Sequence, residues 1–305
     1  MNAHPLSDRL VGIDVGGTKT QLAAIDDAGD RRDVVGPSSD WRCGHLFSDR
    51  ENLPRLAAWI AARTRIDEAT TIVIGLRDCD TDADIELACS TLSATLGHAV
   101  RVENDADLLG PAMGVDHAVA MVVGTGAIVS ARDAAGRRIT ADGYGWLFGD
   151  WGSGPGLVRD AIGRVLTATD AGGAAEDDGL ILALFHHFDS GNAAELAAAA
   201  TTVTDPLQLG EAAPLVFAAA RDGSALARAT IDFAADRLAE GVAAVIRRGG
   251  LGERVVAAGG VIVNQPMLRD AVRARLAGHE HPLTLSLLDV PPVEGALRLA
   301  ASVAV

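Results

Sequence analysis

LVGIDVGGTKTQLAAID, residues Leu10 to Asp26, consists of two apolar runs rich in β-forming residues, with a turn at Gly16 and Gly17 between them. This pattern predicts a strand, a glycine turn and a returning strand. AVAMVVGTGAIVSARD, residues 118 to 133, repeats the pattern around the turn Gly124-Thr125-Gly126. The chain therefore begins a similar lobe twice.

Strand and helix signals alternate along the rest of the chain. The sequence predicts a strand ending near Gly36, a helix over Leu53–Ala62, a strand over Thr71–Leu76, a helix over Ala83–Leu96, a strand ending at Val102, a long helical stretch from Gly156 to about Arg248, a strand ending at Gly259, and a last helix near Pro292. This alternation favours an α/β fold with mixed sheets, and 305 residues are enough for two lobes.

The charge and cysteine content exclude several classes of protein. Acidic side chains outnumber basic ones by 41 to 26, for a formal net charge of -15, so we expect neither nucleic acid nor a membrane surface as partner. Cys43, Cys79 and Cys89 show no C-x-x-C spacing, and the first residues lack the pattern of a signal peptide. No run reaches the ~18 apolar residues of a membrane helix. We therefore expect a cytoplasmic protein with reduced thiols.

Glycine turns between strands suit phosphate binding, because a backbone without Cβ atoms approaches an anion closely and its N–H groups converge on the oxygens. Neither turn fits a known single motif. A Walker loop would run into a helix after its lysine, whereas Lys19 precedes a strand, and GTGAIV at 124–129 lacks the third glycine of a dinucleotide fingerprint. Glycine turns of this kind are more often ordinary hairpins when taken singly, and it is the conjunction of two of them that indicates nucleotide binding.

Five motifs in order resemble the BadF-type ATPase and N-acetylglucosamine kinase family, which has the actin-like, sugar-kinase superfold. They are GIDVGGTKT (12–20), VENDA (102–106), VGTGA (123–127), GYGWLFGDWGSG (143–154) and VVAAGG (255–260). The resemblance implies two ribonuclease-H-like lobes with a nucleotide and sugar cleft between them. It also implies an N-terminal lobe of residues 1–113, completed by a C-terminal helix over 293–305, and a second lobe of residues 114–292.

The resemblance implies ATP and Mg2+ as cofactors. The phosphate-contacting positions would be Gly16, Gly17, Thr18, Lys19, Gly124, Thr125 and Gly126, and the segment near adenosine would be Gly259 and Gly260. Asp14 would hold Mg2+ through water, because this ion prefers oxygen ligands and keeps several of its water molecules. Two alternatives stay open: Asp14 as a cap of the adjacent turn, and Lys19 as a cation resting at a strand edge.

Asp105 matches the family's catalytic carboxylate, which accepts the proton of the attacking sugar hydroxyl. Its neighbour Asn104 falls among the substrate-contacting positions. The alternative for this segment is helix capping, for which Asn and Asp are common residues. A glycosidase pair formed with Glu103 is disfavoured, because it would explain neither glycine turn.

The family's sugar-contacting positions correspond to Asp40, Gly143, Tyr144, Gly145 and Asp150. The sequence departs from the family pattern at two of them, where Asp40 replaces an Asn and Tyr144 a Trp. It also departs at two nearby positions, where Trp151 replaces a Glu and Arg77 a small residue. We expect the Asp40 carboxylate to favour an ammonium-bearing sugar, because it accepts from a cation better than an amide does. Arg77 could cancel this charge by pairing with Asp40 or Asp78, or could itself bind an acidic sugar.

The expected function is ATP-dependent phosphorylation of an amino sugar hydroxyl by an N-acetylglucosamine kinase-like or glucosamine kinase-like enzyme. The expected partners are a small sugar and a second copy of the chain in a homodimer. One alternative is an activating ATPase of a radical dehydratase or reductase, which would need cysteines placed to share an iron-sulfur cluster. The other is a non-catalytic sugar-binding regulator.

Overall fold

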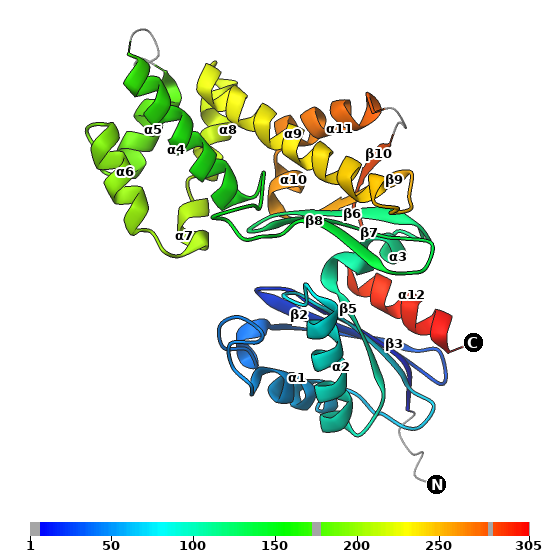
Figure 1. The fold of residues 1–305 in the computed structure, drawn as a ribbon. Coiled ribbons are helices and arrows are strands. Elements are labelled where there is room, and N and C mark those ends of the chain that lie inside the picture. The colour runs from blue at the N-terminus through cyan, green and yellow to red at the C-terminus, as the bar shows by residue number, and fades with distance from the viewer. Residues whose placement is uncertain (1–6, 173–177, 280–282, 305) are drawn as a thin grey trace. The chain divides into compact units, whose positions relative to one another are not determined.

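Two five-stranded mixed sheets form the framework of the protein (Figure 1). The computed structural model describes residues 7–172, 178–279 and 283–304. His117–Leu287 forms one unit, and the described residues before and after it together form the other. We call the latter the first unit and His117–Leu287 the second unit. The last helix of the chain thus belongs with the N-terminal residues.

The first unit follows the expected order of strands and helices. Its elements are β1 (Asp8–Val15), β2 (Lys19–Asp26), β3 (Arg31–Pro37), η1 (Ser38–Asp40), α1 (Asn52–Ala61), β4 (Thr71–Leu76), α2 (Asp82–Leu96), β5 (Val100–Asn104), η2 (Asp105–Leu108), α3 (Leu109–Ala112) and α12 (Val293–Val303). Local chemistry sets the ends of α2: Thr81 and Asp84 form a reciprocal capping box at its start, and Gly97 ends it with a φ of 64°.

The first sheet has the strand order β3-β2-β1-β4-β5. Strands β1, β2 and β3 are antiparallel neighbours, whereas β4 and β5 run parallel to β1. The register aligns Val15 with Leu76 and Leu76 with Asn104. The residues that follow these three therefore leave the sheet side by side at one edge, which we call the carboxyl edge.

Helix α12 packs directly on the first sheet because glycines let the backbones approach. A Cβ at Gly12 of β1 would lie 2.7 Å from the backbone nitrogen of Leu297, and one at Gly295 would lie 2.1 Å from the carbonyl oxygen of Leu108. Arg298 donates to the carbonyl oxygens of Pro111 and Ala112 at 2.8 and 2.7 Å. The C-terminal helix is thereby fixed against the N-terminal strands.

The second unit repeats the topology of the first with a larger helical part. Its elements are β6 (Ala118–Val123), β7 (Ala127–Arg132), β8 (Arg138–Asp142), α4 (Gly154–Ala171), α5 (Gly179–His187), α6 (Ala193–Thr202), α7 (Pro206–Gly210), α8 (Ala213–Arg221), α9 (Ala225–Arg247), β9 (Arg254–Ala258), α10 (Gly260–Asn264), α11 (Pro266–Ala277) and β10 (Thr284–Leu287). Its sheet has the order β10-β9-β6-β7-β8, with an antiparallel meander β6-β7-β8 and with β9 and β10 parallel to β6 and β9 respectively.

The α/β fold class with two ribonuclease-H-like sheets is confirmed, and several details differ from the sequence prediction. Strands β8 and β10 and helices α10 and α11 were not expected. The stretch from Gly156 to Arg248 is divided into several helices, with polar caps such as Asn192 and Ser224 at their starts. Within the described ranges, no helix combines the length and apolar character needed to cross a bilayer.

Candidate active site

The carboxyl edge of the first sheet gathers most of the chemistry predicted for the first unit. Strand β1 ends beside Gly16, β4 is followed by Arg77, and β5 is followed by Asp105. Because β4 lies between β1 and β5 in the sheet, Arg77 leaves the edge between the glycine turn and Asp105. Carboxyl edges of parallel strands are the usual place for ligands in α/β proteins.

The turn after β1 is exposed to solvent, and Ser38 makes hydrogen bonds to its backbone. Its residues Gly17, Thr18 and Lys19 are exposed. The Gly16 N–H donates to the carbonyl oxygen of Lys19 at 3.0 Å, and the Ser38 N–H donates to that of Thr18 at 2.9 Å. The Ser38 hydroxyl donates to the Gly16 carbonyl at 2.9 Å. The turn is thus rigid, and its outer surface is available to a ligand.

Asp14 is a buried carboxylate at this edge, only 6% exposed. No residue in the described part of the chain donates a hydrogen bond to it, so it does not cap the turn beside it. Burial raises the pKa of Asp14 to about 6, against the opposing charge of Lys19. Lys19 therefore acts electrostatically on this carboxylate.

These residues fit a Mg2+ ion that keeps most of its water. In the described ranges, no three His, Cys, Asp or Glu side chains come together as a metal cage. Mg2+ is commonly held by one or two carboxylates together with water and substrate phosphates, so it does not need such a cage. Asp14, a buried oxygen donor without a hydrogen bond beside an open glycine turn, suits that mode of binding.

Asp105 begins η2 and is partly exposed. Burial of its carboxyl group raises the pKa to about 7; the charge of Asp14 raises it further, and Arg77 opposes the change. A carboxylate with a pKa near neutrality both ionises at physiological pH and has the basicity to take a proton. The predicted general base is therefore electrostatically suited to that role.

The capping role that competed with this interpretation belongs to Asn104. Its side-chain oxygen accepts from the Ala106 N–H at 3.0 Å, and its Nδ2 donates to the carbonyl oxygen of Cys79 at 3.0 Å. Asn104 is thus a structural tie between the ends of β4 and β5. Glu103 is buried and paired with Arg101, with 2.5 Å between Oε1 and Nη2.

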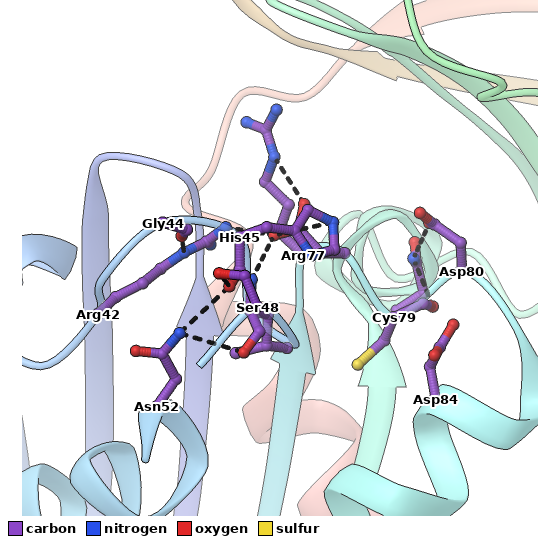
Figure 2. Close-up of polar contacts among 12 residues, drawn as sticks. Arg42, Gly44, His45, Ser48, Asn52, Arg77, Cys79, Asp80 and Asp84 are labelled. Atoms are coloured by element: carbon purple, nitrogen blue, oxygen red, sulfur yellow. Dashed lines mark hydrogen bonds and ion pairs between the residues drawn. The ribbon is translucent and has the colours of Figure 1, made fainter. Parts of the chain in front are cut away.

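The residues after β4 form a charged cluster with the loop of residues 41–48 (Figure 2). Asp78 pairs with Arg42, accepts from the Leu46 N–H at 3.3 Å, and lies 3.6 Å from the Nε of Arg77. Asn52 pins the same loop by donating to the carbonyl oxygens of three of its residues, Cys43, His45 and Leu46. Of the two pairings considered for Arg77, the one with Asp78 is present.

Asp40 ends η1 and is exposed. Its Oδ2 lies close to the strand before it, since a Cβ at Gly36 would be 3.4 Å away. The carboxylate is therefore accessible from solvent.

In the second unit, three glycine segments meet at the end of β6. The Gly124 N–H donates to the Gly126 carbonyl at 2.8 Å, and the Gly154 N–H donates to the Gly124 carbonyl at 2.8 Å. A Cβ at Gly124 would lie 3.5 Å from the nitrogen of Gly260. Gly259, with a φ of 107°, lies so close that its Cβ would be 2.4 Å from the Val123 carbonyl oxygen. The structure thus brings together the predicted positions of the second turn and of the adenosine segment.

A cavity of about 420 Å³ opens beside these glycines. Its lining combines the predicted Gly124, Thr125 and Gly260 with residues that the sequence did not single out. Those include Pro206, Leu207, Gly210, Glu211, Asn264 and Gln265. Ala213, Pro214 and Phe217 complete much of the apolar wall.

The predicted sugar loop is organised by Asp142, a residue that the motif comparison missed. Its carboxylate accepts from the N–H groups of Asp150 and Trp151, both at 2.8 Å. Gly143 and Gly145 both have a φ of 82°, which places Tyr144 between two left-handed residues and leaves it 74% exposed. The loop thus presents an accessible aromatic side chain.

Asp150 and Trp151 lie apart from that exposed tip. Asp150 is buried against the second glycine turn, where a Cβ at Gly126 would be 3.3 Å from its Oδ2. Trp151 packs edge-on against Phe233 at 5.5 Å, and Arg159 and Arg237 lie over its ring at 4.5 and 5.1 Å. Trp151 therefore has a packing role within the second unit.

Known proteins share both the sequence pattern and the fold. Over 179 residues the chain is 28% identical to an N-acetyl-D-glucosamine kinase of Dictyostelium discoideum, a match that covers 53% of this chain and 55% of that relative. The matched region thus spans about half the length of the curated relative.

Two solved structures extend the likeness to nearly the whole chain. Both come from proteins provisionally assigned as N-acetylglucosamine kinases. The one from Chromobacterium violaceum is 24% identical, with a TM-score of 0.68, over 97% of this chain and 100% of that one. The one from Porphyromonas gingivalis is 20% identical, with a TM-score of 0.61, over 97% and 100%. At these identities the likeness establishes the fold.

The family assignment comes from a match to the whole pattern of motifs. The model of the BadF/BadG/BcrA/BcrD ATPase family matches residues 11–300, which include both glycine turns, Asp105 and the segment at Gly259. The chain therefore belongs to the BadF/BadG/BcrA/BcrD ATPase family.

Proposed function

We propose that this protein is an ATP-dependent sugar kinase that phosphorylates a hydroxyl group of an amino sugar. The observation that carries the proposal is Asp105, whose pKa is raised to about 7, on the same sheet edge as the glycine turn and Asp14. Membership in an ATPase family and the likeness to N-acetylglucosamine kinases support the donor and the class of acceptor.

In this proposal Asp105 acts as general base. It accepts the proton of the sugar hydroxyl while the hydroxyl oxygen forms a bond to the γ-phosphorus of ATP. The bond from that phosphorus to the bridging oxygen breaks, and ADP leaves with the electron pair. Because this reaction needs little covalent chemistry from the protein, the rest of the site contributes position and charge.

The glycine turns would hold the phosphates through their backbone N–H groups. Gly16, Gly17 and Thr18 provide such groups in the first unit, and Gly124, Thr125 and Gly126 in the second. Mg2+, when bound, neutralises charge on the β- and γ-phosphates. Asp14 would hold it through water, and Lys19 would add a positive charge nearby.

The cavity in the second unit would take the nucleoside part of ATP. Its volume of about 420 Å³ and its apolar wall around Phe217 suit a flat heterocycle. Gly260 lines the cavity together with Gly124, and Gly259 lies beside them. In the second unit the candidates for sugar contact are Gly143, Tyr144, Gly145 and Asp150. In the first unit the candidate is Asp40, because the side chain of Asn104 is engaged in ties within the protein. Exposed Tyr144 offers a ring face for a sugar.

A coupled assay of ADP release tests the proposal. Hexoses, amino sugars, their N-acetyl forms and muramic derivatives are compared with Mg2+ present. We expect sugar-dependent release that falls about 100- to 10,000-fold in Asp105→Asn, as for loss of a general base. The matched control is Asp82→Asn, an exposed carboxylate of α2 outside the capping box, which should leave the rate unchanged. ADP release that no sugar stimulates would contradict the kinase proposal and favour an activating ATPase.

The identity of the amino sugar is tested at Asp40. We propose that its accessible carboxylate selects glucosamine over N-acetylglucosamine, because an ion pair with an ammonium group is stronger than a neutral contact. The kcat/KM for glucosamine divided by that for N-acetylglucosamine should fall about tenfold in Asp40→Asn. An unchanged ratio would refute this assignment and leave the kinase activity itself unaffected.

Two further parts of the proposal concern the state of the protein in the cell. We propose a homodimer and a cytoplasmic location, the setting in which a sugar kinase meets ATP. Light scattering at several concentrations tests the dimer, and a mass of one chain throughout would contradict it.

A further inference from the structure

Arg77 leaves the first sheet at the centre of its carboxyl edge. It follows β4, which lies between β1 and β5, and its backbone N–H donates to the Val15 carbonyl at 3.1 Å. Because Val15, Leu76 and Asn104 are in register, Arg77 stands between the turn that follows β1 and the Asp105 that follows β5.

The guanidinium of Arg77 is directed towards the glycine turn. A Cβ at Gly17 would lie 2.7 Å from Nη1 and 3.4 Å from the central carbon of the guanidinium. A side chain at position 17 would therefore displace the guanidinium from this position. The same cation acts on Asp105, because its charge lowers the pKa of that carboxylate. Arg77 therefore influences both the turn and the general base.

Arg77 pairs with Asp78, which is in turn held by the loop of residues 41–48 (Figure 2). Asp78 is itself fixed by Arg42 and by the Leu46 N–H, so it offers a rigid partner to the Nε of Arg77 at 3.6 Å. The Arg77 side chain remains 40% exposed. It is thus anchored at its Nε side and open to solvent over part of its surface.

This position matters because of what phosphoryl transfer requires. The group in transit lies between the phosphates of the donor and the attacking hydroxyl, and its negative charge must be balanced at that point. In the proposed function the turn at Gly17 marks the donor phosphates and Asp105 marks the hydroxyl. A cation between these two groups therefore lies where the negative charge of the transition state develops.

We propose that Arg77 contacts the phosphoryl group during its transfer and stabilises the charge of the transition state. This inference rests on the proposed function. The planar guanidinium donates two parallel hydrogen bonds to phosphate oxygens, which the ammonium of a lysine does not. The bond changes are those of the kinase step, in which Arg77 neither gains nor loses a proton.

Two other roles for Arg77 predict different results. If it only tuned Asp105, its removal would raise the pKa of that carboxylate, and the rate would recover at high pH. If it bound an acidic sugar, its removal would raise KM for that sugar and leave kcat with neutral sugars unchanged. The proposed contact predicts a loss of kcat that persists at about pH 9, where Asp105 is ionised in either form.

The test uses the full chain as wild type, Arg77→Gln, Arg77→Lys and the control Arg9→Gln. Arg9 is exposed near the opposite end of β1. Calorimetry measures the affinity for ADP with Mg2+, with and without aluminium fluoride, which mimics the phosphoryl group in transit. We expect aluminium fluoride to tighten ADP binding to the wild type and to Arg9→Gln. Arg77→Gln should lose about 10- to 100-fold of this gain, with its affinity for ADP alone unchanged. Arg77→Lys should lie between them.

The outcomes separate this inference from the proposed function. An equal aluminium fluoride gain in wild type and Arg77→Gln, or a kcat that recovers at about pH 9, overturns the role of Arg77 and leaves the kinase proposal standing. If aluminium fluoride does not tighten ADP binding to the wild type, the role of Arg77 is also overturned. The assay of sugar-dependent ADP release then decides separately whether the kinase proposal stands. Thermal unfolding of each variant verifies that it is folded.

Discussion

Gly259 and Gly260 are adjacent glycines for which the structure predicts opposite effects of the same substitution. Gly259 joins β9 to α10 with a φ of 107° and a ψ of 149°, a region that side chains rarely adopt. Its Cβ would meet the Val123 carbonyl oxygen at 2.4 Å and the Val123 nitrogen at 2.9 Å. A Cβ at Gly260 would have no described atom within 4 Å. Position 259 therefore excludes alanine, and position 260 accepts it.

The magnitude of the Gly259→Ala effect has two sources. Backbone strain in this region costs about 1–3 kcal/mol, and forcing a carbon against the β6 backbone costs a further ~1–3 kcal/mol. We expect a loss of about 2–6 kcal/mol in the free energy of unfolding of the second unit. For Gly260→Ala, at the first position of α10, we expect a change between zero and a gain of about 1 kcal/mol.

Differential scanning calorimetry of the full chain measures both variants. It resolves two transitions if the units unfold separately, and a fall of at least about 5 °C is expected for the second unit in Gly259→Ala. The transition of the first unit should not move. Equal stability of Gly259→Ala and wild type, or an equal loss in Gly260→Ala, would refute the account of this contact.

Three further predictions concern the carboxylates of the first unit. The acid limb of kcat/KM should have its midpoint near pH 7, where Asp105 ionises, and Asp80→Asn should move it to lower pH, because the charge of Asp80 raises this pKa; a midpoint near 4 would contradict the role of Asp105. Asp105→Asn should raise the free energy of unfolding at pH 8 by about 1–3 kcal/mol. A carboxyl group whose pKa is raised from 3.8 to about 7 makes the native state less stable as pH increases through that window. Urea titration at pH 8 and pH 4 should show this gain at pH 8 only. Asp14→Asn should increase the Mg2+ concentration for half-maximal activity about tenfold or more, and an unchanged Mg2+ dependence would exclude Asp14 from metal binding.

The sequence was most informative where fold and chemistry depend on local signals. The turns at Gly16–Gly17 and Gly124–Gly126 were visible because glycines interrupt continuous apolar runs, and both hairpins are present as expected. Asp105 followed from its motif, and its raised pKa agrees with the assigned role. Local signals of this kind need no knowledge of the tertiary structure.

Other features could not be predicted because they depend on contacts between distant residues. Strands β8 and β10 are sheet edges, and β10 pairs only with β9, so neither needs a long apolar run. The cavity at Gly260 takes part of its wall from α7, which is separated from it by tens of residues in the sequence. The role of Asp142 depends on a loop conformation that no pattern in the residues expresses.

The packing of α12 on β1 has a consequence for biosynthesis. The ribosome synthesises the chain from its N-terminus, so strands β1 to β5 emerge long before α12, the helix that packs on Gly12 and Leu108. Throughout that interval the nascent first sheet exposes an apolar face to solvent, a state that chaperones recognise. The first unit thus completes its fold only after the second unit has been synthesised, although most of its residues are made first.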